Sequence, residues 1–317
     1  MKQKLKIAFL MDPLENLDLK GDTTFALALE AQKRNHHISH FKPDDLILRS
    51  NNVIANICEF QLFSKNELDS YEYGIRKLEL LSNYDVVMMR QDPPFDLSYI
   101  TATHILEKLP SKTLVVNNPY EVRNAPEKIF VTNFSELMPE TLISKDINII
   151  KSFRDEFKDI IIKPLYGNGG QGVFHVMPSD ENLNSILEMF FKQSNEPLMI
   201  QKYIPDVRNG DKRIILLNGE SVGAINRIPS KGESRSNMHV GGKAMKTSLT
   251  ERDHFICKTI SESLKQKGLI FVGIDIIGDY LTEINVTSPT GIREIKSHSS
   301  IIIEEMFWNF IEDKLTT

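Results

Sequence analysis

Several features are scarce in this sequence of 317 residues, and each scarcity excludes a class of protein. The two cysteines, Cys58 and Cys257, lie far apart in the chain, which favours a reducing cytoplasm over a disulfide framework. The net charge of −5 provides no basic excess for binding nucleic acid. The first apolar run, residues 5–11, is too short for a signal peptide, and no run is long enough to span a bilayer. We therefore expect a soluble cytoplasmic protein that binds neither nucleic acid nor a membrane.

Common catalytic motifs are absent as well. The chain has no G-x-x-x-x-G-K-[ST] phosphate loop and no Ser/His/Asp or Cys/His arrangement in a recognisable local context. The spacing of His36, His37 and His40 would suit a metal site, but these residues follow the polar end of a helix. A solvated connection between a helix and a strand explains them better. Covalent catalysis therefore has no support from the sequence.

The order of the predicted elements indicates two domains. In residues 1–124 strands alternate with helices, which is typical of an α/β layer with parallel strands. The predicted strands are 5–11, 86–90 and 113–117, and the predicted helices are 23–34 and 99–108. The pattern changes after residue 123, so that residues 125–317 form the second domain. Its predicted strands are 159–165, 173–177, 198–204, 213–217 and 221–227, and its predicted helices are 148–157, 183–192, 251–267 and 301–313.

Polar residues and proline follow three of the first-domain strands, at 11–13, 90–94 and 117–119. In open α/β sheets the carboxyl ends of parallel strands form the ligand-binding crevice. Proline also ends a strand simply because it lacks a backbone donor. Ligand binding and strand termination both remain open for these segments.

Residues 271–285 carry the strongest functional signal. Two β-rich runs flank Gly278-Asp279, which predicts a tight hairpin with Asp275 opposite Glu283. Glu283 and Asn285 are two residues apart and point to the same face. Two carboxylates and an amide oxygen suit Mg²⁺, because a cation between the carboxylates removes their mutual repulsion. The alternative is an exposed hairpin edge whose charges prevent aggregation.

A second signal is the glycine-rich segment 166–172. Gly167, Gly169 and Gly172 fit G-x-G-x-x-G, but a β-like run follows, whereas a dinucleotide-binding fold needs a helix there. With Gly170, these residues predict a flexible loop between two antiparallel strands, able to place backbone N–H groups on phosphate oxygens. A plain bulged hairpin is the alternative.

Basic residues near this loop indicate an anionic ligand. Lys163 lies within the β run 160–164, where an unpaired charge would be costly to bury unless a phosphate pairs with it. Lys128, near the domain boundary, is a second candidate. Arg213 begins a strand and is expected to point into the same cleft.

Together these residues resemble the ATP-grasp enzymes and, more narrowly, the bacterial glutathione synthetases. The likeness covers essentially the whole chain in the family's order. Its segments are 11–13, 89–96, 124–128, 162–165, 167–172, 210–213 and 267–295, and 283–290 is the most specific of them. The resemblance implies an ATP-grasp fold with an N-terminal parallel α/β substrate domain, a central lid subdomain at about 128–203 and a C-terminal antiparallel sheet. It also implies ligation of γ-glutamylcysteine to glycine through an acyl phosphate.

The resemblance implies roles for the nucleotide-binding and catalytic residues. Lys128 and Lys163 match lysines that hold ATP phosphates, and Arg213 and Arg227 match arginines that face the reacting phosphate and carboxylate. Positions matching cofactor-binding residues are Lys128, Lys163, Gly167, Gly169, Gly170, Gly172, Gln201, Tyr203 and Ile204, of which the last three lie in the segment that contacts adenine. Asp275, Glu283 and Asn285 match the metal-binding positions, with Mg²⁺ or Mn²⁺ as the metal.

The peptide substrate would be expected at Asp12, Arg90, Asp92, Ser288 and Arg293. Family members often form homotetramers, so the resemblance also implies a homo-oligomer. The chain departs from the family at residues 238–240, which are usually smaller, and at Lys243, where arginine is common. These departures put the expected loop closure and acceptor specificity in question, but not the class of reaction.

Two other functions remain open. The first is another carboxylate–amine ligase of the same fold, such as a D-alanine–D-alanine ligase, although the segment 90–96 argues against it. The second is a non-catalytic nucleotide-binding module, although Lys163, Asp275, Glu283 and Asn285 together argue against it, because binding alone would need fewer charged groups. The segment 229–242 has no helix or strand period, and we expect it to be a lid over the acyl phosphate.

Overall fold

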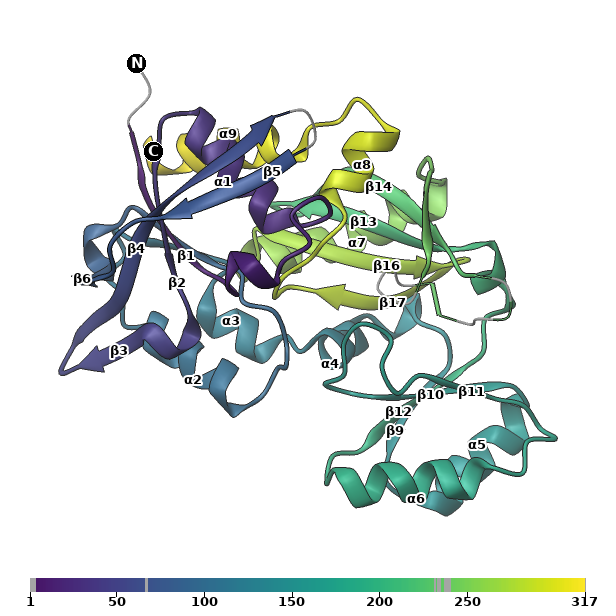
Figure 1. Ribbon diagram of the computed structural model, residues 1–317. Helices are drawn as coiled ribbons and strands as arrows, with labels where there is room; N and C mark the ends of the chain where they lie inside the picture. Colours follow the sequence, from purple (N-terminus) through teal and green to yellow (C-terminus); the bar gives the residue numbers. More distant parts are fainter. Residues whose placement is uncertain (1–3, 66–67, 231, 233–234, 237–240, 317) are drawn as a thin grey trace.

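The computed structural model describes residues 4–65, 68–230, 232, 235–236 and 241–316, arranged around three sheets (Figure 1). Much of the loop 229–242, which was predicted to cover the acyl phosphate, lies outside the described residues, including Met238, His239 and Val240. No helix among the described residues is long and apolar enough to cross a membrane.

The N-terminal sheet has a parallel centre in the order β2-β1-β7-β8. These strands are β1 (Lys6–Leu10), β2 (His37–Phe41), β7 (Val86–Met89) and β8 (Leu114–Val116). The helices of this part are α1 (Thr23–Lys33), α2 (Leu97–Leu106) and α3 (Pro119–Asn124). Asp22 caps α1 by accepting a hydrogen bond from the Phe25 amide. The predicted alternation of strand and helix is present at the expected positions.

An antiparallel extension of this sheet was not predicted. It consists of β3 (Leu46–Arg49), β4 (Asn52–Lys65), β5 (Leu68–Tyr73) and β6 (Lys77–Leu80), with β4 paired to β2 and to the other three. The buried side chains of β4 change phase between Ile57 and Phe60, with Cys58 also buried. This break in the period of two explains why the alternation in β4 is hard to recognise in the sequence.

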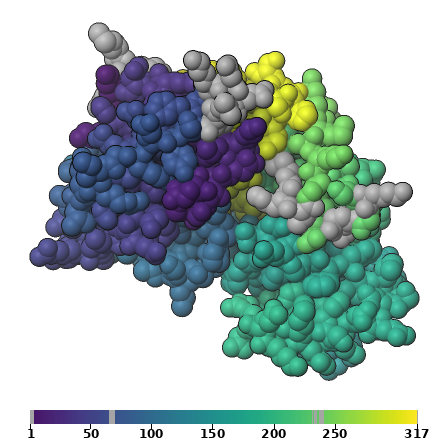
Figure 2. Space-filling view, in the orientation of Figure 1, coloured from purple at the N-terminus to yellow at the C-terminus, as the bar shows by residue number. Residues whose placement is uncertain are grey.

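The central subdomain, called the lid from here on, is a four-stranded antiparallel sheet with two helices on one face. Its elements are β9 (Thr141–Ser144), α5 (Ile147–Phe157), β10 (Ile160–Pro164), β11 (Phe174–Val176), α6 (Leu183–Gln193) and β12 (Leu198–Lys202). Ile150, Ile160, Leu187 and Ile200 belong to a hydrophobic cluster confined to this subdomain. The lid accordingly forms a distinct lobe below the rest of the molecule (Figures 1 and 2).

The C-terminal sheet is antiparallel, in the order β15-β14-β13-β16-β17. Its strands are β13 (Asp211–Leu217), β14 (Glu220–Ile228), β15 (Lys243–Lys246), β16 (Phe271–Ile277) and β17 (Tyr280–Asn285), and the helices around it are α7 (Glu251–Gln266), α8 (Ile292–His298) and α9 (Ile303–Thr316). The short helix α4 (Glu127–Phe130) lies against β17. A Thr250–Asp253 capping box begins α7.

The N-terminal and C-terminal sheets share their cores. Phe9 and Val86 belong to the same hydrophobic cluster as Phe271 and Trp308, and the Trp308 indole donates to the Leu27 carbonyl at 2.7 Å. These two parts are therefore packed into one body. The chain's C-terminal helix α9 returns to pack on α1 (Figure 1).

Asn117 also joins the two sheets. Its side-chain amide donates to the carbonyls of Phe271 and Val286 at 2.8 and 2.7 Å, and its oxygen accepts from the Phe271 amide at 2.8 Å. The side chain is buried and all three of these bonds go to backbone groups. The side chain of Asn117 therefore has a structural role, because its hydrogen bonds join the two sheets.

Candidate active site

A cleft with a volume of about 480 Å³ lies between the lid sheet and the C-terminal sheet, and it extends to the N-terminal domain. Its lid wall includes Lys163 and the glycine loop, and its floor includes Arg213 and Asp275. The predicted site residues that line it are Asp92, Lys128, Lys163, Gly167, Gly169, Gly170, Gln201, Tyr203, Ile204, Arg213, Arg227, Asp275, Glu283, Asn285 and Ser288. Asp12, Arg90, Gly172 and Arg293 are not among the lining residues.

The β16–β17 hairpin has the predicted register. Its turn is formed by Gly278 and Asp279, and Asp275 lies directly opposite Glu283. Gly278 has a φ of +56°, a left-handed conformation that suits glycine. A register shift follows Asp275, but it does not separate the two acids. The prediction of facing carboxylates is therefore confirmed.

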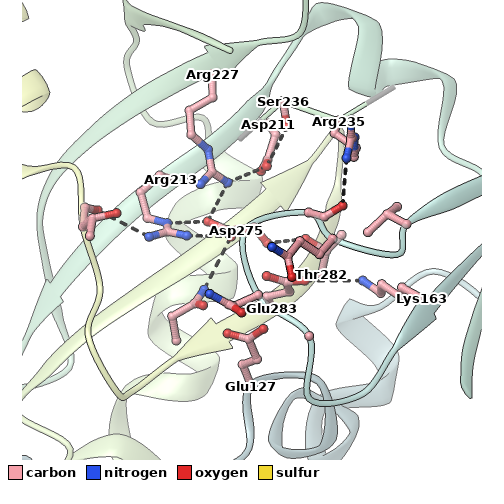
Figure 3. A pocket seen from close by; sticks show the side chains of 18 of the residues that line it. Glu127, Lys163, Asp211, Arg213, Arg227, Arg235, Ser236, Asp275, Thr282 and Glu283 are labelled. Carbon is pink, nitrogen blue, oxygen red and sulfur yellow. Dashed lines mark hydrogen bonds and ion pairs between the residues drawn. The ribbon is translucent and has the colours of Figure 1, made fainter. Parts of the chain in front are cut away.

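Asp275 is bound by two arginines (Figure 3). Arg213, opposite it on β13, donates from Nε to Oδ1 at 2.5 Å and from Nη2 to Oδ2 at 2.9 Å. Nη2 of Arg227, on β14, is 2.9 Å from Oδ1. Burial would raise the pKa of Asp275, but the two arginines outweigh burial and hold this pKa well below its ordinary range. Asp275 is thus fully ionised at neutral pH and orients both guanidinium groups.

Glu283 is bound by two lysines. Its Oε1 is 3.5 Å from Nζ of Lys128 and 3.7 Å from Nζ of Lys163. Burial lowers the pKa of Lys163, whereas Glu283 and Glu127 raise the pKa of Lys128 more than burial lowers it. From the sequence, Lys163 is expected to have no charged partner within the protein. Glu283 is such a partner, so the cost of burying this lysine is partly offset before any phosphate binds.

Charge balance bears on the metal prediction. Four of the carboxylates that line the cleft, Glu127, Asp211, Asp275 and Glu283, are paired with four of its cations, Lys128, Lys163, Arg213 and Arg227. The other charged lining residues are Asp18, Asp22, Asp92, Glu294, Lys202 and Arg235. A nucleotide triphosphate would bring several further negative charges into a site whose central cations are already paired with carboxylates, and it would need counterions. Among the described residues, no group of three or more His, Cys, Asp or Glu side chains is placed to hold a metal ion.

The residues present nevertheless fit Mg²⁺. Asp275 and Glu283 face each other, and the Asn285 amide is 3.4 Å from Oδ2 of Asp275. This donor set supplies hard oxygen ligands, and Mg²⁺ commonly takes only one or two carboxylates from a protein and the rest from phosphate and water. The assignment of these three residues to a metal remains a prediction.

The glycine loop joins two antiparallel strands, β10 and β11, as predicted. Gly169, Gly170 and Gly172 all have positive φ, and a Cβ on Gly169 would meet no atom within 4 Å, so this part of the loop faces open space. The Lys128 ammonium donates to the Gly167 carbonyl at 2.6 Å. One of the two lysines that are predicted to hold phosphates is thereby tied to the loop itself.

The far end of the lid offers an apolar surface for an aromatic base. Gln201 lies near the end of β12, and its side-chain amide donates a hydrogen bond to the Thr141 hydroxyl at 3.0 Å. Tyr203 and Ile204 follow the strand. Tyr203 stacks on His175 with ring centroids 4.0 Å apart. The apolar residues that line the cleft around this segment are Ile161, Val173, Ile204, Val207 and Ile277.

The predicted peptide-binding residues divide into two groups. Asp92 and Ser288 line the cleft, and the Asp12 carboxylate holds the Asp92 amide at 2.9 Å. Arg90 is buried and donates to Thr24 at 3.0 Å and to the Pro289 carbonyl at 3.1 Å. Arg293 donates to the Leu19 carbonyl at 2.8 Å. Asp12, Arg90 and Arg293 thus bind neighbouring segments and do not line the cleft themselves.

Two acids of the cleft were not predicted from the sequence. Asp211 and Glu127 line the cleft, and both are raised in pKa, primarily by burial. Both lie next to residues that were singled out, Asp211 two positions before Arg213 and Glu127 beside Lys128. The period of two along β13 places Asp211 on the same face as Arg213, which is the signal that would have identified it.

Comparison with known proteins identifies the family. Residues 5–123 match the model of the prokaryotic glutathione synthetase N-terminal domain, and residues 127–300 match that of its ATP-grasp domain. The glutathione synthetase of Mesorhizobium japonicum is 57% identical over 98% of this chain and 99% of its own length. That of Brucella melitensis is 54% identical over 97% and 98%.

Solved structures show the same fold at low sequence identity. A D-cycloserine synthetase superimposes with a TM-score of 0.70 at 12% identity, covering 98% of this chain and 99% of the other. A Microcystis aeruginosa macrocyclase bound with a precursor peptide gives 0.66 at 16% identity, covering 98% and 100%.

The three-sheet fold and the cation-lined cleft define an ATP-grasp enzyme, an ATP-dependent ligase. Two family models and near-full-length identities above 50% make the assignment narrower. The chain belongs to the prokaryotic glutathione synthetase family. The fold class, the family and the ligase activity predicted from the sequence are therefore confirmed.

Proposed function

We propose that this cleft joins the cysteinyl carboxylate of γ-glutamylcysteine to the amine of glycine, with ATP as the phosphoryl donor. The observation that carries the proposal is the convergence of four buried cations on one cleft. Lys128 and Lys163 come from α4 and the lid, and Arg213 and Arg227 come from the C-terminal sheet. Such an arrangement suits a transferring phosphoryl group, whose charge it neutralises from both sides.

Activation of the carboxylate is the first step. The cysteinyl carboxylate oxygen attacks the γ-phosphorus of ATP, and ADP leaves, giving an acyl phosphate. Lys128, Lys163 and the glycine loop hold the phosphates, while Gln201 to Ile204 and the apolar residues around them hold the adenine. The protein contributes positioning and charge neutralisation to this step.

Amide formation is the second step. The glycine amine attacks the acyl carbon, and Arg213 and Arg227 stabilise the oxyanion of the tetrahedral intermediate before phosphate leaves. Asp275, Glu283 and Asn285 would hold Mg²⁺, or Mn²⁺, which when bound offsets the charge of the phosphate oxygens. The γ-glutamyl group is held at the end of the cleft that is formed or supported by Asp12, Arg90, Asp92, Ser288 and Arg293.

One assay tests this function against the alternatives. Purified protein receives ATP, Mg²⁺ and γ-glutamylcysteine, with glycine present, omitted or replaced by D-alanine, and ADP and the ligated product are measured. Equal amounts of ADP and glutathione are expected with glycine, and little ADP without it. Product formed equally well from D-alanine would support another carboxylate–amine ligase, and no product at all would support a binding module.

We also propose that the domains span residues 1–124 and 125–317, with the lid at about 128–203. The protein functions in the cytoplasm. It assembles as a homo-oligomer, namely a tetramer. Support for an oligomer comes from a row of aliphatic side chains across β3, β4 and β6, in which Ile47 and Leu80 flank Ile54. Ile47 and Leu80 are 39% and 37% exposed, and Leu78 beside them is 68% exposed. Sedimentation of the parent and of Leu78→Glu tests it, since the substitution should lower the oligomer's mass.

A further inference from the structure

One buried acid in the cleft has no role in the reaction described above. Asp211 begins β13, is 8% exposed, and lies beside the arginines that would face the acyl group (Figure 3). Its Oδ2 accepts hydrogen bonds from Arg227 Nη2 and from Ser236 Oγ, the latter at 2.9 Å. Its Oδ1 is buried and accepts no hydrogen bond within the part of the chain that the structure describes. A buried carboxylate oxygen without a donor needs an explanation.

The reaction itself needs a proton acceptor, because glycine reaches the cleft as an ammonium ion without a free electron pair. Lys128, Lys163, Arg213 and Arg227 are donors and cannot accept this proton. Asp275 is bound by two arginines and Glu283 by two lysines, which lowers the pKa of both acids although burial alone would raise it. Neither is therefore a good base for an amine.

Of the described acids paired with these four cations, Glu127 remains, and it lies at the other end. It pairs with Lys128, the lysine that contacts the glycine loop, so it belongs to the phosphate side of the cleft. Asp211 instead lies opposite Arg227 on β14, on the side where the acceptor amine would approach the oxyanion-stabilising groups.

Building on the proposed function, we propose that Asp211 is the general base that takes a proton from the ammonium group of glycine. Oδ1 accepts one proton, and the freed nitrogen lone pair forms the C–N bond with the acyl carbon. The C–O bond to phosphate then breaks. Of the two further protons on nitrogen, one stays in the amide and the other passes to the departing phosphate, which leaves as hydrogen phosphate. Asp211 returns its own proton to solvent in the next cycle.

The environment of Asp211 suits this role. Burial raises its pKa most, and the charge of Asp275 on β16 adds to this. Arg227 on β14, the Ser236 hydroxyl and Arg213 on the same strand lower it, and the result is a pKa of about 6. Such a carboxylate is ionised at neutral pH, yet it accepts a proton more readily than an ordinary aspartate.

The test compares two acceptors in Asp211→Asn, which keeps the size of the side chain and an oxygen for Arg227. Glycine must lose a proton before it attacks, whereas hydroxylamine is already a neutral amine near neutral pH. We expect kcat/KM for glycine to fall by about 10²–10³-fold, and the rate of hydroxamate formation to fall at least about tenfold less. Equal losses with both acceptors, or no loss with glycine, would overturn the proposal. Asp206→Asn, an exposed acid outside the cleft, is the matched control.

The pH profile gives a second readout that a structural role would not change. For the parent, kcat/KM for glycine should rise to a plateau above about pH 6, where Asp211 is ionised. For Asp211→Asn it should keep rising with pH, because only amine deprotonated by solvent reacts. Ser236→Ala retains the carboxylate but removes a hydrogen bond that lowers its pKa, and should move the rising limb upward. If the rising part of the pH profile of kcat/KM is unchanged in both variants, Asp211 is not the base. Glutathione formation by the parent tests the proposed function separately.

Discussion

Arg213 and Asp275 face each other on neighbouring strands and meet in a two-point ion pair with distances of 2.5 and 2.9 Å. Arg227 contacts the same carboxylate, so one buried acid orients two guanidinium groups before any substrate arrives. Donors held in place in this way need no reorganisation when an oxyanion develops between them. The ion pairs thus preorganise the side of the cleft to which we assign amide formation.

The first prediction concerns Glu283, which faces Asp275 and both lysines. Glu283→Gln should remain folded but lower kcat by about 10²–10³-fold, because it removes a charged group at the centre of phosphoryl transfer. Turnover at saturating Mg²⁺ and circular dichroism measure the two effects. Glu188→Gln, on the exposed face of α6, is the control. Turnover near the parent value in a folded variant would remove Glu283 from the site.

Lys163 allows binding to be separated from stability. Lys163→Met should weaken ATP binding by at least about tenfold, since a buried cation of the lid wall is lost. The melting temperature should stay level or rise, because burial of the lysine costs more than its 3.7 Å contact with Glu283 returns. Calorimetry measures both quantities, with the exposed Lys192→Met as the control. Unchanged ATP affinity would show that Lys163 does not contact the nucleotide.

Asn117 should matter for stability. Asn117→Ala leaves the Phe271 amide and two buried carbonyls without their side-chain partner, which should lower the free energy of unfolding by about 2–4 kcal/mol. Denaturant titration measures the loss. An effect below about 1 kcal/mol would mean that water replaces these bonds.

The raised pKa of Asp211 predicts how stability depends on pH without ligands. Folding favours the protonated acid, because its pKa is about 6 in the folded protein against an ordinary 3.8. Its stabilising contribution is therefore complete below pH 3.8 and is lost as pH rises through about 6. Between about pH 4 and pH 7, Asp211→Asn should gain about 2 kcal/mol relative to the parent. Denaturant titrations at the two pH values measure this difference, and a difference independent of pH would contradict it.

Local patterns were sufficient for much of the fold. The runs 160–164 and 271–277 are strands because β-branched residues dominate them, and Asp275 faces Glu283 because a tight turn determines the register of its hairpin. The long strand β4 was missed because its apolar alternation changes phase near Cys58. Recognition of such a strand depends on its partners, which come from distant segments.

The sequence by itself determined many of the elements, the register of the hairpin predicted to bind the metal and, through the order of its motifs, the family. It did not determine which charges pair. Residues 213 and 275 are 62 positions apart, and the contact of Lys163 with Glu283 joins the lid to the C-terminal sheet. Whether a buried charge is paired, and whether an acid such as Asp211 keeps an oxygen without a donor, depends on strands brought together by the tertiary fold. Only this packing decides the desolvation and the charge partners that give each group its chemistry.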